Sequence, residues 1–323
     1  MERMRPIVAP LVGGLALLIA LLGLIGTAIR DPHPHDIAVG LVGPAPAVQQ
    51  ISTAFGANAP GAFQFTTYGS EADARAALDS RTVDGVLVLG GSTPRLILAG
   101  AAGDAATGVI TAAFTNMFKA QGATVDIEVV HPFASGDAHG LILFFVVVAA
   151  IISTLVAQAI LFALARTAGF GTRMTVVLAY AVLAGIAAMG TAEWIAGDYG
   201  SGFWTAVGLV MLASAAVGAV VAGSIRLLGA AGIGLAALVV VLLDLVSSGG
   251  PVGSQLLPDF YRAVAPWMPA GPLYGALRGA LYFDGAGVGG PLVVLFGWLA
   301  AGLVLMLLGQ LLAGRRRSVV PQR

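Results

Sequence analysis

The stretch GLILFFVVVAAIISTLVAQAILFALA, residues 140–165, carries no charge and decides how the chain is organised. An apolar run of about 20 residues is long enough for a helix to cross the hydrocarbon core of a bilayer. From here to residue 313 the sequence stays almost continuously apolar, with short polar breaks. This block predicts five membrane-spanning helices, over residues 140–165, 174–195, 203–225, 228–246 and 289–313.

A further apolar run, residues 7–29, predicts a sixth membrane-spanning helix. Because Arg3 and Arg5 precede it, a cleaved signal peptide is the alternative interpretation. The apolar core of a signal peptide spans about 7–15 residues, and this run is longer. We therefore expect an uncleaved anchor in residues 1–29.

The composition agrees with a membrane protein. Of the 323 residues, 58% are hydrophobic and 10% are charged, whereas soluble domains carry about a quarter charged residues. The chain has no cysteine, which excludes disulfides, thiolate metal sites and cysteine nucleophiles.

Residues 30–138 differ from the rest because their hydrophobic runs are short and separated by helical patterns. Ser70 followed by Asp73 resembles a helix-capping box. We expect strands over 36–42, 63–68, 85–89, 95–99 and 124–130, and helices over 47–57, 70–80 and 104–121. Strands that alternate with helices predict a small α/β domain with a largely parallel sheet.

The arginines fall on one side of the predicted spans, and short loops rich in arginine face the cytoplasm. They are Arg3, Arg5, Arg166, Arg173, Arg226, Arg315, Arg316 and Arg317. Aspartates border the spans on the other side, at Asp31, Asp137, Asp198, Asp259 and Asp284. The sequence thus predicts an α-helical multi-pass protein of the cell membrane, with six transmembrane helices and cytoplasmic termini. One extracytoplasmic α/β domain, residues 30–138, lies between helices 1 and 2, and a basic tail, 314–323, follows the five-helix block, 139–313.

No catalytic, cofactor-binding or metal-binding set is recognisable. Gly90-Gly91 lacks the Lys-Ser/Thr of a phosphate-binding loop. His33 and His35 have no third ligand at a useful spacing. We therefore expect no enzyme activity, no cofactor and no nucleic-acid partner.

The long loop 247–288 combines prolines, aromatic residues and a mostly apolar helical pattern that carries Arg278. Trp267 and Tyr274 suit the level of the lipid headgroups. A broken helical hairpin that re-enters the bilayer is one interpretation. An amphipathic helix lying flat on the outer surface is the other.

Two acidic residues lie near the outer ends of predicted spans, Asp244 and Glu193. A carboxylate within a span indicates a functional site. We name Asp244, Glu193, Trp267 and Arg278 as candidates for a transport pathway or gate. The spacing Ala219-x-x-x-Gly223 is more typical of close helix packing.

The order of one span, an external α/β domain and five further spans resembles the type-two ABC exporter permeases, closest to the branch that includes the phage infection protein family. The stretches that carry this resemblance are Tyr68-Gly69-Ser70-Glu71-Ala72, Ala76-Ala77-Leu78, Val83-Asp84-Gly85-Val86-Leu87-Val88, Pro132-Phe133 with Asp137 and Gly140, Leu257-Pro258, Ala265-Pro266-Trp267-Met268-Pro269 and Ala276-Leu277-Arg278.

The resemblance implies a permease subunit that forms a homodimer or pseudo-dimer among membrane lipids and pairs with a separate cytoplasmic ATPase. The cargo would be a lipid, a peptide or another amphipathic molecule moved outward. Arg166, Phe170 and Arg173 are then the candidate ATPase-docking residues, and residues 258–283 form a re-entrant helical pair at the outer gate. The alternative function is a non-transporting membrane scaffold or receptor whose external domain binds a cell-envelope partner.

Overall fold

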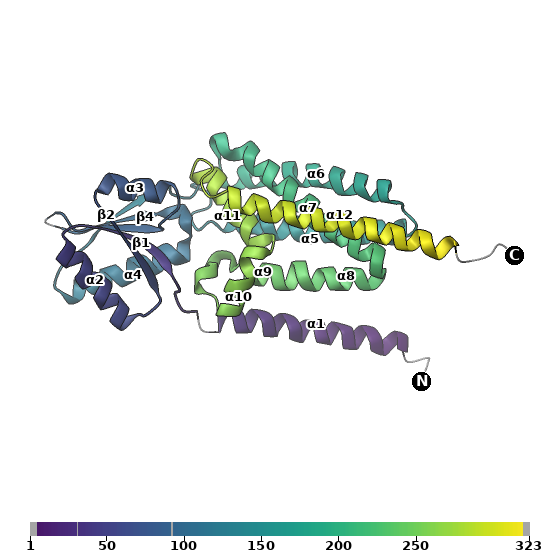
Figure 1. The fold of residues 1–323 in the computed structure, drawn as a ribbon, viewed down its shortest axis with the longest axis horizontal. Coiled ribbons are helices and arrows are strands. Elements are labelled where there is room, and N and C mark those ends of the chain that lie inside the picture. The colour runs from purple at the N-terminus through teal and green to yellow at the C-terminus, as the bar shows by residue number, and fades with distance from the viewer. Residues whose placement is uncertain (1–4, 31, 92, 319–323) are drawn as a thin grey trace.

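The computed structural model describes residues 5–30, 32–91 and 93–318, which form an α/β domain at one end of a block of long helices (Figure 1). The first helix, α1 (Arg5–Ile29), begins at the end of the block away from the sheet, and the last, α12 (Gly289–Ser318), ends there. We call this end the far end and the other the domain-side end.

Five strands form one sheet in the order β2-β1-β3-β4-β5. They are β1 (Ile37–Val42), β2 (Phe63–Tyr68), β3 (Gly85–Val88), β4 (Arg95–Ala99) and β5 (Asp126–Val130). All neighbouring pairs are parallel except β3 and β4. The connection between those two strands is too short for a crossover, so they form a hairpin. The predicted strands and the largely parallel sheet are confirmed.

Helices cover both faces of the sheet. On one face, α2 (Ala45–Asn58) and α4 (Asp104–Ala120) enclose a core that includes Leu41 and Phe114. On the other face, α3 (Glu71–Asp79) packs over a smaller core, into which Phe283 of the helix block also inserts. The domain is therefore fastened to the helices through part of its own hydrophobic core.

The start of α3 is capped as the sequence predicts. The Asp73 backbone N–H donates to Ser70 Oγ at 3.1 Å. The second half of the motif differs, because the Ser70 hydroxyl itself donates to Asp73 Oδ2 at 2.7 Å. The shorter aspartate side chain thus bonds the capping hydroxyl instead of the capping backbone N–H that a glutamate reaches.

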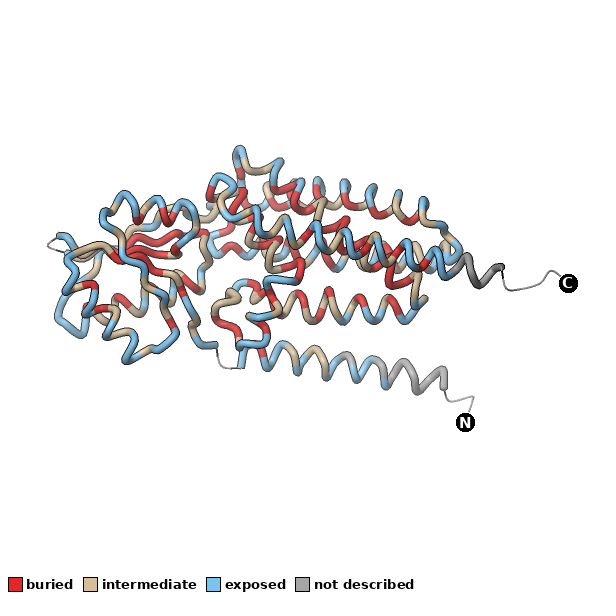
Figure 2. The backbone as a smooth tube through the Cα atoms, in the orientation of Figure 1, coloured by how far each residue is buried: buried red, intermediate tan, exposed pale blue. Residues whose placement is uncertain are grey.

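Within the described residues, five helical segments are long and apolar enough to cross a membrane. They comprise α5 (Leu141–Leu164), α6 (Phe170–Ala196), α7 (Phe203–Leu228), the run α8 (Ala230–Ala237), π-helical turn (Leu238–Leu243) and α9 (Asp244–Ser247), and α12. They confirm the five predicted spans of the block. Helix α7 is the most buried of them and forms its centre (Figure 2).

Helix α1 lies beside the block and is mostly exposed along its described side chains (Figure 2). It touches the block near its C-terminal end, where Ala28 packs with Leu257 and Tyr261. Tyr261 Oη also donates to the Leu24 carbonyl at 2.9 Å. The predicted first span is thus a helix held to the block at one end.

The loop before α12 contains two short helices, α10 (Asp259–Val264) and α11 (Ala270–Tyr282). Leu273, Ala276 and Leu277 of α11 are fully buried in the core shared by α5 and α7. Helix α11 therefore packs into the block and does not lie flat on its surface. Tyr274, expected at the headgroup level, is buried as well, because it lies on the packed side of α11.

Candidate functional site

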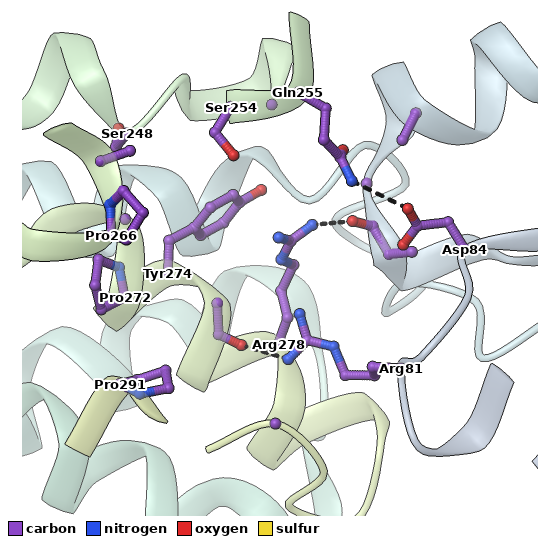
Figure 3. A pocket seen from close by; sticks show the side chains of 18 of the residues that line it. Arg81, Asp84, Ser248, Ser254, Gln255, Pro266, Pro272, Tyr274, Arg278 and Pro291 are labelled. Atoms are coloured by element: carbon purple, nitrogen blue, oxygen red, sulfur yellow. Dashed lines mark hydrogen bonds between the residues drawn. The ribbon is translucent and has the colours of Figure 1, made fainter. Parts of the chain in front are cut away.

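A cavity of about 830 Å³ lies where the α/β domain meets the domain-side end of the helix block (Figure 3). Its walls come from segments far apart in the sequence: the turn after α3, the start of α4, the loop before α10, α11 and the start of α12. Cavities at domain junctions are the usual place for ligands.

Arg81 enters the cavity from the turn after α3, where its backbone adopts a left-handed conformation (φ 60°). Its Nη1 donates to the Gly275 carbonyl of α11 at 2.8 Å. A Cβ at residue 279 would lie 2.9 Å from this nitrogen. Gly279 therefore gives the guanidinium the room to reach α11.

Arg278 enters the cavity from α11 and faces the domain. Its Nη1 donates to the Ala102 carbonyl, and its guanidinium carbon lies 4.6 Å from the centre of the Tyr274 ring. Its Nε is buried and has no hydrogen-bond partner among the described residues. Arg278 thus joins the two halves of the molecule and still has donor capacity left.

The carboxylate of Asp84 interacts with the charges of both Arg81 and Arg278. Gln255 Nε2 donates to Asp84 Oδ2 at 3.1 Å. Burial raises the pKa of the Asp84 carboxyl, while the Gln255 hydrogen bond and the charges of Arg278 and Arg81 oppose that shift. Burial, and then repulsion from Arg278, lower the pKa of Arg81 to about 10. Arg81 therefore keeps its charge at neutral pH, and the polar wall is cationic.

The opposite wall of the cavity is apolar. Figure 3 shows Pro266, Pro272 and Pro291 on one side of the site, with Arg81, Asp84 and Gln255 on the other. Trp267 and Val294 also belong to the cavity lining. The Trp298 indole N–H donates to the Trp267 carbonyl at 2.7 Å, which ties this wall to α12.

The structure brings together two of the four predicted gate residues. Trp267 and Arg278 line the cavity. Glu193 is half-buried near the end of α6 and does not belong to the lining. Asp244 lies behind the cavity wall and is fully buried.

Asp244 begins α9, directly after the π-helical turn of the fourth span of the block. Its Oδ1 accepts the Ala270 backbone N–H, at the start of α11, at 2.8 Å. Its Oδ2 is buried and has no partner among the described residues. A carboxylate at a helix N-terminus bonds a free N–H and complements the helix dipole. Asp244 therefore fixes where α11 begins.

The three predicted docking residues lie at the far end of the block. Arg166 is exposed and stacks on Phe162, with its guanidinium carbon 5.5 Å from the ring centre. Phe170 is half-buried against the cluster of α6, α7 and α12. Arg173 is 2% exposed and donates to the Ala168 and Arg166 carbonyls. Arg173 therefore stabilises the adjoining loop and is not exposed for contact with a partner.

Sequence reasoning missed Arg81, Asp84 and Gln255 as site residues. Asp84 stood within a stretch that carried the family resemblance, directly before a buried strand, and this was the available signal. Nothing local distinguishes Arg81, because its partner Gly275 lies nearly two hundred residues away. The described part of the chain contains no cluster of three or more histidine or acidic side chains that suits a metal ion.

Comparisons with protein-family models, with curated proteins and with solved structures give no match for this chain. The function must be argued from the cavity and from the arrangement of charges.

Proposed function

We propose that this chain is the membrane permease subunit of an ABC-type exporter, which moves an amphipathic cargo outward and is powered by a separate ATPase. In this proposal α1 is the sixth transmembrane helix, residues 30–138 lie outside the cell membrane, and both termini lie in the cytoplasm. The observation that carries it is the junction cavity, which combines two arginines with an apolar wall that continues into α12.

The distribution of charge supports this orientation. Arg173 and Arg226 both donate to the Ala168 carbonyl, so these arginines gather at the far end of the block. Asp137 and Asp259 lie at the domain-side end. Arginine-rich short loops mark the cytoplasmic side, so the domain would be extracytoplasmic. Protease added to intact cells should then digest the domain and spare the far end; digestion only after lysis would overturn the topology.

The pairing with an ATPase is tested by purification. The tagged full-length chain, extracted in a mild detergent, should retain an ATPase subunit, and that ATPase should change its turnover when the permease is present. Arg166→Glu should weaken this association if the exposed far-end loop forms part of the contact. Absence of any ATPase in a well-folded preparation would count against the exporter.

A second function, a scaffold or receptor for a cell-envelope partner, is favoured by the edge strand β5. Ile127 and Val129 on this edge are 43% and 54% exposed and line a cavity of about 650 Å³ beside α4. An exposed apolar edge strand is a surface on which partners dock. Ile127→Asp with Val129→Asp should abolish partner capture and leave transport intact if this function is separate.

A further inference from the structure

The junction cavity contains two half-buried arginines, Arg81 and Arg278, whose charge the protein does not neutralise. Among the described residues, neither Arg81 nor Arg278 has a carboxylate within ion-pair distance, and both donate to backbone carbonyls. Arg262, the third arginine in the lining, differs because it pairs with Asp36 and Asp259. Buried charges in proteins are normally paired.

Two like charges at such close quarters repel one another. Burial and the neighbouring Arg278 both lower the pKa of Arg81, which shows that the charged form of Arg81 is disfavoured by its surroundings. Asp84 offsets only part of this charge, because burial raises its own pKa and Gln255 already occupies its Oδ2. An anion that accepts hydrogen bonds from both guanidinium groups would remove the repulsion. The Nε of Arg278 also has no hydrogen-bond partner among the described residues, but it lies below the cavity surface.

The apolar part of the cavity lining indicates which kind of molecule would carry such an anion. From the arginines the lining passes Tyr274 and reaches Pro272 and Pro291 (Figure 3). Val294 also belongs to the lining. Pro291 and Val294 belong to the first turns of α12, and the adjacent Val293 is 74% exposed. The apolar wall thus leads onto a membrane-facing helix. A free inorganic anion would leave this wall bare.

We propose that the cavity binds a lipid with an anionic phosphate headgroup, with the phosphate held between Arg81 and Arg278 and the acyl chains leaving along the start of α12. Guanidinium groups recognise phosphate oxygens through paired, charge-assisted hydrogen bonds. If the proposed transport function holds, this lipid class is the cargo or a close analogue of it. The binding site itself requires no ATPase.

The test is lipid retention by the full-length protein in nanodiscs made from equal amounts of phosphatidylglycerol and phosphatidylcholine with identical acyl chains. The two lipids share the phosphate, but phosphatidylcholine adds a quaternary ammonium that the arginines repel. After a detergent wash, mass spectrometry gives the ratio of the retained lipids. The wild-type protein should enrich phosphatidylglycerol, and equal retention of both lipids would overturn the proposal.

Substitutions test whether Arg81 and Arg278 cause the enrichment of phosphatidylglycerol. Arg81→Gln with Arg278→Gln should lower the enrichment by about tenfold, the loss expected for one strong charge-assisted contact. Arg262→Gln is the matched control, because it removes the same charge from the same cavity but from an arginine that is already paired; it should keep the enrichment. Loss in Arg262→Gln equal to that in the double variant would refute the specific site.

Because the arginines also fasten the domain to the helices, a loss after substitution could reflect misfolding. Asp84→Asn answers this, since it removes a negative charge beside the arginines and should raise the enrichment, which misfolding does not do. Inorganic phosphate separates the two sources of the anion. Thermal stabilisation by phosphate alone equal to that by phosphatidylglycerol would overturn the assignment to a lipid. The assay contains no ATPase and no ATP, so its failure leaves the exporter proposal standing, and the reverse is also true.

Discussion

The two ends of the helix block both contain arginines, but the helices pack tightly towards the far end and leave a cavity at the domain-side end. In the half of α7 that leads to the far end, α12 approaches so closely that a Cβ at residue 302 would lie 2.5 Å from the Val220 nitrogen. At the domain-side end α11 lies in the core between α7 and α5, and the junction cavity opens beside it. Both ends contain arginines removed from water: Arg173 is buried, and Arg81 and Arg278 are half-buried. The far end is closed and the domain-side end is open.

The difference lies in what the arginines bond. Arg173 donates to two carbonyls of its own adjoining loop, Ala168 and Arg166, and so ties together a local turn. Arg81 and Arg278 reach across to elements distant in sequence and line the junction cavity. Unpartnered donors occur at both ends, at Arg173 Nη1 and at Arg278 Nε, but Arg173 lines neither described cavity. An arginine removed from water therefore indicates a binding site only when it also lines a cavity.

The largest expected effect comes from opening the closed end. Gly302→Val places a branched side chain against the Val220 backbone, which cannot move aside as a side chain can. We expect a loss of about 3 kcal/mol in the free energy of unfolding, measured by titration with SDS in mixed micelles. Gly297→Val is the matched control on the same helix, because a Cβ there meets open space. Equal stability of the two variants would break the comparison between a closed and an open end.

The second effect concerns the helix that keeps the domain-side end open. Asp244→Ala removes the acceptor of the Ala270 N–H and should cost about 2 kcal/mol of unfolding free energy. Asp244→Asn keeps an oxygen acceptor and should cost less than half of that. Because the chain has no cysteine, a Ser254→Cys reporter in the cavity wall can be labelled selectively, and its labelling rate should change only in the alanine variant. If both variants lose transport while remaining equally stable, the carboxylate charge itself matters and our structural assignment is wrong.

The third prediction distinguishes the loop-stabilising Arg173 from the cavity arginines Arg81 and Arg278. Arg173→Gln should loosen the loop that contains Ala168 and cost about 1 kcal/mol, seen as faster trypsin cleavage near Arg166. Arg166→Met, at an exposed position, would remove the cleavage site and serves as the control for where cleavage occurs. Retention of phosphatidylglycerol should be unchanged in both variants. A drop as large as that of the Arg81 and Arg278 substitutions would show that the far end also binds the lipid.

How far the sequence anticipates this molecule depends on the range of the interactions concerned. The spans and strands were predictable because they follow from local length and alternation, and the Ser70 cap depends on a residue three positions away. The position of Arg278 was noticeable because a charge on an apolar helix is unusual. The contacts of Arg81 with Gly275 and of Asp244 with Ala270 join separate elements, and no local pattern reports them.

Arg173 shows a different reason for failure. A loop arginine beside a span is typical of a cytoplasmic surface, and its position in the sequence says nothing about whether it points outward. The short loop 165–169 leaves carbonyl groups without helical partners, and the buried guanidinium satisfies Ala168 and Arg166. Charge patterning thus predicts a side of the membrane for this loop, but it does not predict which charges are free to dock.

The smallest expected effect is the pH dependence of the open end, and it rests on Asp84. Burial raises the pKa of this carboxyl above its ordinary value of 3.8, against the opposing influence of Gln255, Arg278 and Arg81. Since the folded state then binds the proton more tightly than the unfolded state, Asp84 favours folding most below pH 3.8, and this contribution is lost as pH rises through the raised pKa. Protonation also removes the negative charge beside the arginines, so phosphatidylglycerol enrichment should increase as pH falls through that window. Asp84→Asn should show high enrichment throughout and lose this dependence. A wild-type enrichment that decreases on acidification, or an Asp84→Asn profile that follows the wild type, would mean that Asp84 does not tune the cavity.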